Sequence, residues 1–244
     1  MPSTEVIDES REILDSIKDE FPTKLDGKEC VLWMKENSPN WKQMEWPGFF
    51  FEDYIRDNIL KKKIGGGEGP SYDRIVFDYK KDFVWDLKMH SIYNTKDRKQ
   101  DWVIFNDLEA LKHGISNWHG IGFIIGQGVM KYEEDGEFRR WHNELKGGLS
   151  DYQKKKRNEG ASHRTRKKGC EVKGVTSLFF DNSDVLRRGR QEGWLKGFQE
   201  GMINSNDNPR RAKVQVNIEE LPEDFILHEL IVDDGEYRFK ETLS

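Results

Sequence analysis

An acid and a lysine stand two residues apart within residues 72–90, a stretch in which apolar and polar residues alternate. The pattern predicts two short strands, 72–78 and 83–90, joined by a polar turn. Side chains two residues apart on a strand lie on the same face, so Asp86 and Lys88 share a face. A half-buried strand has little structural reason to hold both, and the pair is therefore a candidate site for chemistry.

Asp73, at the head of the first strand, adds a second carboxylate. Two nearby carboxylates can bind a hard divalent cation such as Mg²⁺ through oxygen and leave positions for water and a phosphate. A lysine beside them can orient or deprotonate the attacking water and neutralise charge on the phosphorane oxygens. The alternative is an exposed cross-strand ion pair without a catalytic role.

A third acid, Glu52, lies in the apolar segment 49–60. Ile55 and Ile59 follow it by three and seven residues, so on a helix the three side chains share one face. An acid that points inward costs free energy unless a positive partner meets it, and a metal or a water on that metal would serve. The alternative is an acid in the first helical turn, where the helix dipole favours it.

Glu52 on a helix, Asp73, and Asp86-Leu87-Lys88 after twelve intervening residues resemble the motif of the PD-(D/E)xK nuclease superfamily, which has the restriction-endonuclease-like fold. The resemblance covers about a third of the chain. It implies an α/β fold with an αβββαβ core, in which helices flank a mixed central sheet. The remaining C-terminal part is expected to be a mixed α+β elaboration of that core.

The resemblance also implies an activity, the Mg²⁺-dependent hydrolysis of DNA phosphodiesters. By this resemblance Asp73 and Asp86 are the metal ligands, and the main-chain carbonyl of Leu87 is a further candidate ligand. Lys88 is the catalytic lysine that positions the water. Glu52 would support a metal-bound water or a second ion.

The composition is that of a protein with a packed core beneath a highly charged surface. The 244 residues are 35% hydrophobic and 35% charged and include eight tryptophans. No apolar run approaches the length of a membrane span, and the N-terminus does not resemble a signal peptide, so we expect a cytoplasmic protein that does not bind a membrane. Cys30 and Cys170 lack metal-ligand spacing and are expected to be reduced thiols.

Positive charge is concentrated between residues 153 and 173 of a chain whose net charge is −5. This stretch holds nine lysines and arginines against two glutamates. Such segregation is the electrostatic footprint of a phosphate-binding arm. The residues expected to contact DNA are Lys154, Lys155, Lys156, Arg157, Arg164, Arg166, Lys167 and Lys168. The alternative is a solvated loop.

We expect one domain with four subregions: a helical N-terminal segment (1–48), a nuclease-like core (49–132), the basic arm (133–174) and a C-terminal elaboration (175–244). Periodicity predicts helices at 3–21, 28–36, 106–115 and 184–202, strands at 121–126, 175–180 and 213–218, and a hairpin at 230–239. The helix at 106–115 would connect two strands of the central sheet as a crossover.

The leading hypothesis is a Mg²⁺-dependent endonuclease that cleaves double-stranded DNA as a type II restriction enzyme. Its compact size and the lack of helicase or ATPase motifs suit a stand-alone, sequence-specific enzyme, and a homodimer is the expected assembly. A DNA repair or recombination nuclease is the nearest alternative within this class. The alternative from another class is a catalytically inactive nucleic-acid-binding protein on the same fold.

Overall fold

The computed structural model describes residues 2–161, 163–182, 184–203 and 208–240, apart from the side chains of Tyr152 and Lys156. The helices are α1 (Thr4–Glu20), α2 (Gly27–Asn37), η1 (Pro39–Lys42), α3 (Trp46–Tyr54), the π-helical η2 (Ile55–Leu60), α4 (Lys61–Lys63), α5 (Leu108–Asn117), α6 (Glu137–Leu145), α7 (Asp151–Asn158), α8 (Asp184–Glu192) and η3 (Glu223–Phe225). The strands are β1 (Lys24–Asp26), β2 (Ser71–Tyr72), β3 (Ile75–Val76), β4 (Tyr79–Lys80), β5 (Val84–Ser91), β6 (Trp102–Asp107), β7 (Ile121–Tyr132), β8 (Lys167–Phe180), β9 (Leu195–Phe198), β10 (Lys213–Asn217), β11 (Ile226–Asp233) and β12 (Glu236–Phe239).

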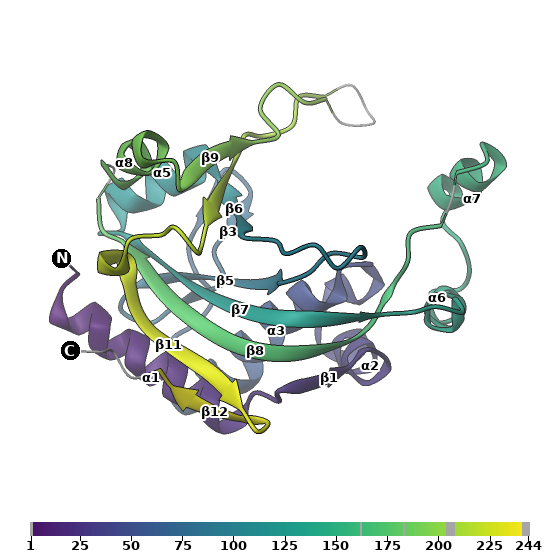
Figure 1. Ribbon diagram of the computed structural model, residues 1–244, viewed down its shortest axis with the longest axis horizontal. Coiled ribbons are helices and arrows are strands. Elements are labelled where there is room, and N and C mark those ends of the chain that lie inside the picture. The colour runs from purple at the N-terminus through teal and green to yellow at the C-terminus, as the bar shows by residue number, and fades with distance from the viewer. Residues whose placement is uncertain (1, 162, 183, 204–207, 241–244) are drawn as a thin grey trace.

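A mixed seven-stranded sheet forms the centre of the molecule, with the order β12-β11-β8-β7-β5-β4 and with β1 paired to β8 (Figure 1). The long strands β7 and β8 are antiparallel, whereas β5 and β7 are parallel. A parallel pair needs a crossover connection, and α5 lies in the chain between these two strands. The expected α/β class, with a mixed sheet flanked by helices, is confirmed.

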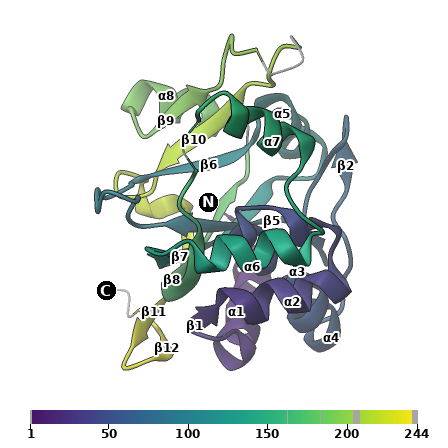
Figure 2. The ribbon, with the colours of Figure 1, turned by 90° about the vertical axis from the view of Figure 1, so that its right-hand side faces the viewer.

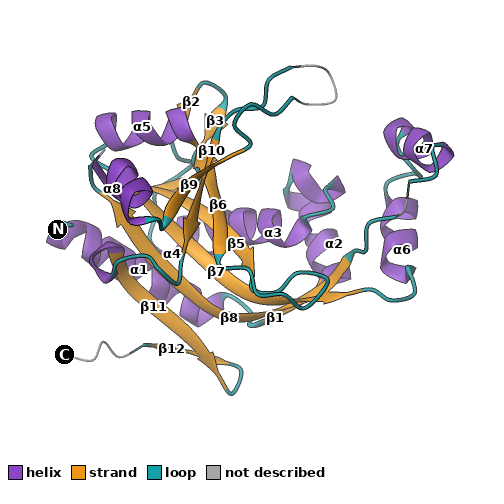
Figure 3. Cartoon of the chain, turned by 45° about the horizontal axis from the view of Figure 1, so that its top comes forward, coloured by secondary structure: helices purple, strands orange, loops and turns teal. Residues whose placement is uncertain are grey.

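Each face of the large sheet carries its own apolar cluster. Alternate residues of β7 divide between the clusters, with Ile124 in one and Phe123 and Ile125 in the other. Helices α1, α2 and α3 cover the first face. The second face is covered by α5, α8 and a three-stranded sheet of order β6-β10-β9, which stands across the large sheet in Figures 2 and 3.

Most predicted elements are present, but several have different bounds. The strands predicted at 121–126 and 175–180 are parts of the longer strands β7 and β8. The helix predicted at 184–202 ends at Glu192, because Gly193 has a φ of +89° and the chain then enters strand β9. The strand predicted at 72–78 is split by a turn into β2 and β3. The hairpin around Asp234-Gly235 is confirmed, with positive φ at both residues, as a two-residue turn requires.

The basic stretch is more ordered than a loop. Residues Asp151–Asn158 form helix α7, which begins with a capping box between Ser150 and Gln153, and β8 starts at Lys167. Cys30 and Cys170 are both buried free thiols, and burial raises the pKa of Cys170 to about 12. No helix in the described residues has the length and apolar character needed to span a bilayer.

Helix α3 approaches the sheet closely because β7 carries a glycine beneath it. A Cβ atom at Gly126 would lie 2.5 Å from a ring carbon of Phe51 on α3. Because Gly126 has no side chain, the helix can pack against the sheet at Phe51, the residue before Glu52. The close approach therefore sets where Glu52 stands relative to β5.

Candidate active site

Three acids converge on the ammonium group of Lys88. Its Nζ lies 3.0 Å from Oδ1 of Asp86, 3.6 Å from Oδ2 of Asp78 and 3.6 Å from Oε1 of Glu52. Asp86 and Lys88 come from β5, Glu52 from α3, and Asp78 from the residue before β4. We call these four residues the carboxylate–lysine cluster.

The cluster lies on an edge of β5 that is not covered by another strand among the described residues. Strand β4 pairs only with Val84 and Trp85, at the beginning of β5. Beyond this point the main-chain N–H of Leu87 donates to the carboxylate of Asp78, with an N···O distance of 2.7 Å. The carbonyl of Leu87 accepts a hydrogen bond from Nζ of Lys88 at 2.9 Å. The main-chain groups of β5 therefore help to hold the side chains in place.

The structure does not bring Asp73 to this cluster, and Asp78 takes the position expected for it. Asp73 and Arg74 form the turn between β2 and β3, with φ values of +42° and +71°. The exposed carboxylate of Asp73 forms an ion pair with Arg211. The sequence spacing selects Asp73 and misses Asp78, because it predicts an uninterrupted strand over residues 72–78. Aspartate tolerates left-handed turn conformations, and this tendency could have identified the turn.

Glu52 lies on the inward side of a helix that changes its geometry just after this residue. Helix α3 continues through the π-helical segment η2 into α4, so the hydrogen-bonding pattern widens from Ile55 onward. Such π segments often occur at functional sites. The inward direction of Glu52 agrees with the sequence prediction, and its positive partner in the structure is Lys88.

Two acids of the cluster, Glu52 and Asp86, have a raised pKa and so hold protons more tightly than free carboxyl groups. Burial, opposed in part by Lys88 and reinforced by Asp78 and Asp53, raises the pKa of Glu52 to about 7. Burial raises the pKa of Asp86 well above its ordinary value, and the nearby Asp78 adds to this effect. At neutral pH a proton is therefore available within the cluster.

For Lys88, unlike for Glu52 and Asp86, the nearby charges outweigh burial in setting the pKa. Burial alone lowers the pKa of its ammonium, but the carboxylates of Asp86, Glu52 and Asp78 outweigh burial and raise it. The side chain is 21% exposed, so it reaches the surface of the cluster. Lys88 therefore keeps its charge at neutral pH and can donate hydrogen bonds to an anionic ligand.

The donor set suits a hard cation, although the acids are not arranged around a shared point. Among the described residues no three His, Cys, Asp or Glu side chains are placed to hold a metal ion, since the acids surround Lys88 instead. However, Oδ2 of Asp86 is buried and has no hydrogen-bond partner. Together with the carboxylate of Asp78 and the carbonyl of Leu87, which both lie around Nζ of Lys88 as Asp86 does, this oxygen makes up an all-oxygen donor set of the kind that Mg²⁺ prefers.

His90, the remaining polar side chain on this face of β5, is not part of the cluster. Its Nε2 contacts the main-chain oxygen of Gln100 at 2.5 Å. Burial lowers the pKa of His90, so the ring is neutral at physiological pH. Its role here is a hydrogen bond to the loop that follows β5.

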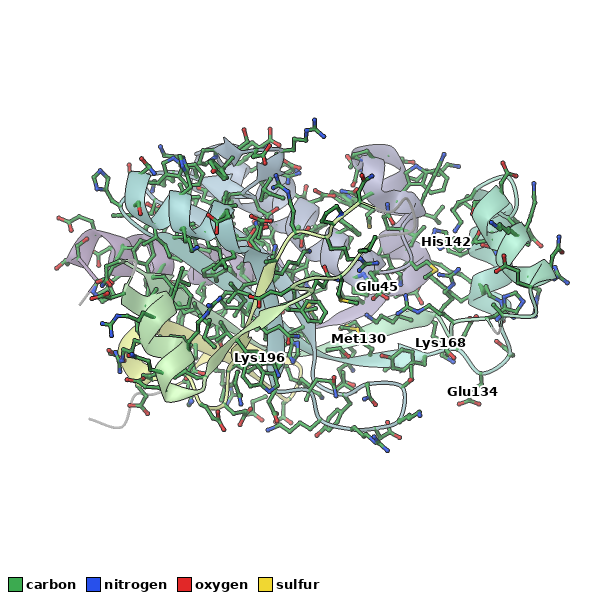
Figure 4. All side chains as sticks on the ribbon, turned by 90° about the horizontal axis from the view of Figure 1, so that it is seen from above. Glu45, Met130, Glu134, His142, Lys168 and Lys196 are labelled. Atoms are coloured by element: carbon green, nitrogen blue, oxygen red, sulfur yellow. The ribbon has the colours of Figure 1, made fainter. Side chains whose placement is uncertain are left out.

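The residues of the predicted DNA-contacting arm fall into different environments. Lys154, Lys155, Arg157, Arg164 and Lys168 are exposed, while the side chain of Lys156 lies outside the description. Lys167 forms an ion pair with Glu45, just before α3. Arg166 is buried, at 6% exposed, and so differs from the exposed contact that the charge pattern predicted. In Figure 4, Lys168 and His142 of α6 lie toward the same end of the molecule, and Lys196 of β9 lies nearer the middle.

No family model matches the chain, and neither the curated proteins nor the solved structures include a match. The geometry of the carboxylate–lysine cluster therefore carries the functional argument.

Proposed function

We propose that the chain is a Mg²⁺-dependent endonuclease that hydrolyses phosphodiester bonds of double-stranded DNA, of the type II restriction class. The observation that carries this proposal is the convergence of Asp78, Asp86 and Glu52 on Lys88 at the open edge of β5. Carboxylates beside a charged lysine, with an oxygen of Asp86 left without a partner, suit phosphoryl chemistry.

The residues that would hold Mg²⁺ are Asp78 and Asp86, with the carbonyl of Leu87. When bound, this ion supplies charge for the phosphate oxygens and lowers the pKa of a water molecule. Asp73, proposed for this role by the sequence resemblance, is ion-paired with Arg211 at another place in the fold. The motif of the family then corresponds here to Asp78 and Asp86-Leu87-Lys88.

Lys88 and Glu52 would have different roles in the reaction, one as a hydrogen-bond donor to the phosphate and the other as a base. Because its carboxylate neighbours raise the pKa of Lys88, its ammonium stays protonated and stabilises negative charge on the phosphate through hydrogen bonds from Nζ. Glu52, whose pKa is raised to about 7 by burial, can accept a proton at Oε1 near neutral pH. Lys88 therefore acts as an orienting donor, and Glu52 is the better candidate for the base.

Exposed basic side chains on α7 and at the start of β8 favour DNA as the substrate. Helix α7 and the start of β8 lie beyond the N-terminal end of α3, the helix that carries Glu52 (Figure 1). Phosphate contacts of this kind position a duplex without reading its sequence. The homodimer expected from the sequence stays a prediction.

Incubation of the purified protein with a long unmodified duplex tests the proposal. We expect discrete fragments with Mg²⁺ and no cleavage with excess EDTA, and Asp86→Ala should be inactive under both conditions. A continuous smear would point to a less specific nuclease of repair or recombination. A mobility shift without cleavage in Mg²⁺ or Mn²⁺ would contradict the enzymatic proposal and favour a binding protein.

A further inference from the structure

A second charged site surrounds a cavity of about 250 Å³ next to α6, α7 and the start of β8. Four arginines line this cavity, which we call the arginine pocket: Arg139, Arg157, Arg164 and Arg166. His163 adds a further polar side chain to the wall. None of the described residues that line the pocket is an acid.

Arg166 is the observation that points to a ligand. Its side chain is buried, with 6% of the residue exposed, yet Nε and Nη1 have no hydrogen-bond partner among the described residues. A buried guanidinium without partners is unfavourable, because it has lost water and gained no hydrogen bonds in exchange. An anion in the pocket would satisfy both nitrogen atoms.

The buried acid Glu133 lies beside the pocket, but the hydrogen bonds that its carboxylate accepts come from main-chain N–H groups. Both carboxylate oxygens of Glu133 accept main-chain hydrogen bonds, from Arg166 at 3.1 Å and from Arg139 at 2.9 Å. Burial lowers the pKa of Arg166, and although Glu133 opposes this effect, Arg139 and Arg164 add to it. Nε and Nη1 of Arg166 therefore have no carboxylate partner among the described residues.

The surroundings of the pocket also carry an excess of positive charge. Burial, together with the charge of Arg166, lowers the pKa of Lys146. Burial lowers the pKa of His142 to about 4, with Lys146 and Arg166 adding to the shift. The positive charges of Arg166 and Lys146 therefore favour a nearby negative charge, whereas the lowered pKa leaves His142 neutral at physiological pH.

From these contacts we infer that the arginine pocket binds a phosphate group, either as free inorganic phosphate or as the terminal phosphate of a nucleic-acid strand. Guanidinium groups match phosphate oxygens in paired hydrogen bonds, which suits several arginines around one anion. The volume is below the roughly 300–1,000 Å³ of sites that enclose whole small-molecule ligands. A phosphate with the atoms next to it therefore fits better than a complete cofactor.

The pocket lies near the beginning of the helix that carries Glu52. Met44 lines it two residues before α3, and the indole N–H of Trp46 donates to the carbonyl of Lys167 at 2.8 Å. The inference needs only the guanidinium groups and therefore does not depend on the metal site. Its failure would leave the nuclease proposal intact, and the reverse is also true.

Thermal melting in inorganic phosphate, compared with chloride at equal ionic strength, tests binding directly. We expect phosphate at about tenfold excess over its Kd to raise the Tm of the wild-type protein by roughly 3–6 °C. Arg166→Met, which keeps the stem and removes the charge, should abolish the rise. Arg140→Met is the matched control, because Arg140 is an exposed arginine on α6 that does not line the pocket. An equal rise in wild type and Arg166→Met would overturn the inference.

If Arg166→Met does not fold, the exposed pair Arg157→Gln and Arg164→Gln takes its place. Titration calorimetry with inorganic phosphate should then show at least about tenfold weaker binding, on the scale of a lost charge-assisted hydrogen bond. Unchanged affinity in this folded double variant would overturn the inference as well.

The source of the phosphate is decided with paired oligonucleotides, with and without a 5′-phosphate, titrated in EDTA. Tighter binding of the phosphorylated strand that disappears in the pocket variants assigns the site to a strand terminus. Pocket-dependent binding of inorganic phosphate, without preference between the two strands, assigns it to free phosphate. The absence of both would overturn the inference.

Discussion

The carboxylate of Asp78 accepts a hydrogen bond from the main-chain N–H of Leu87 at 2.7 Å, and so fixes an acid from one segment to the edge of the neighbouring strand. Because Leu87 stands between Asp86 and Lys88, this bond places Asp78 beside both. The local backbone of β5 thus organises three of the four residues of the carboxylate–lysine cluster. Glu52 is the one member that depends on packing between a helix and the sheet.

Lys88→Met should reduce cleavage by ~10²-fold or more, because the variant removes a positioned donor while keeping most of the side-chain volume. It also removes the positive partner of Asp86, whose pKa should rise further. The loss of stability should therefore be larger at pH 8, where the carboxyl groups must ionise, than at pH 5. Single-turnover rates and urea unfolding of the same samples separate these effects. A rate within tenfold of wild type would show that Lys88 is only structural.

Glu52 should make the protein less stable as pH rises. Its pKa is raised from 4.5 to about 7 by burial, so the folded state holds a proton that the unfolded state releases. Between about pH 4.5 and 7 the free energy of unfolding should fall by an amount on the order of 1–3 kcal/mol from this group, and it should level off above pH 7.

Urea unfolding in EDTA at several pH values measures this effect. Glu52→Gln should lack that part of the decline, so the variant should gain stability relative to wild type as pH rises. Glu134→Gln is the control, since Glu134 is exposed in the connection between β7 and α6 at one end of the molecule (Figure 4). Parallel pH curves for wild type and Glu52→Gln would contradict the environment described for Glu52.

The basic side chains of α7 should contribute to DNA affinity through phosphate contacts. Lys154→Ala with Lys155→Ala removes up to two contacts, so the slope of log affinity against log salt should fall in magnitude by at most ~1.8. The loss should be similar for all duplex sequences. Lys18→Ala on α1 is the control, because α1 and α7 lie at opposite ends of the molecule (Figure 1). An unchanged slope in the double variant would mean that α7 does not touch DNA.

Local patterns in the sequence predict the parts of the site that depend on one element. The two-residue period of a strand correctly places Asp86 beside Lys88, and the helical period correctly turns Glu52 inward. Similarly, the apolar run at the start of β7 predicts a buried strand, as observed.

The features that depend on backbone turns and on long-range packing could not be predicted from the same patterns. The turn at Asp73-Arg74 interrupts a stretch with strand-like composition, and only the fold shows that Asp78 reaches the N–H of Leu87. Likewise, the charge run includes Arg166 without distinguishing it from its exposed neighbours. Only the fold shows that Arg166 is buried and that its main-chain N–H and carbonyl both bond to Glu133.

The composition of the site is tested most directly by comparing Asp78→Asn with Asp73→Asn in a single-turnover cleavage assay with Mg²⁺. Both changes remove one negative charge and preserve side-chain volume, and circular dichroism confirms that each variant is folded. We expect Asp78→Asn to lower the rate by ~10²-fold or more, because it alters a proposed metal ligand, while Asp73→Asn stays within tenfold of wild type. An active Asp78→Asn together with an inactive Asp73→Asn would contradict the site described for this protein.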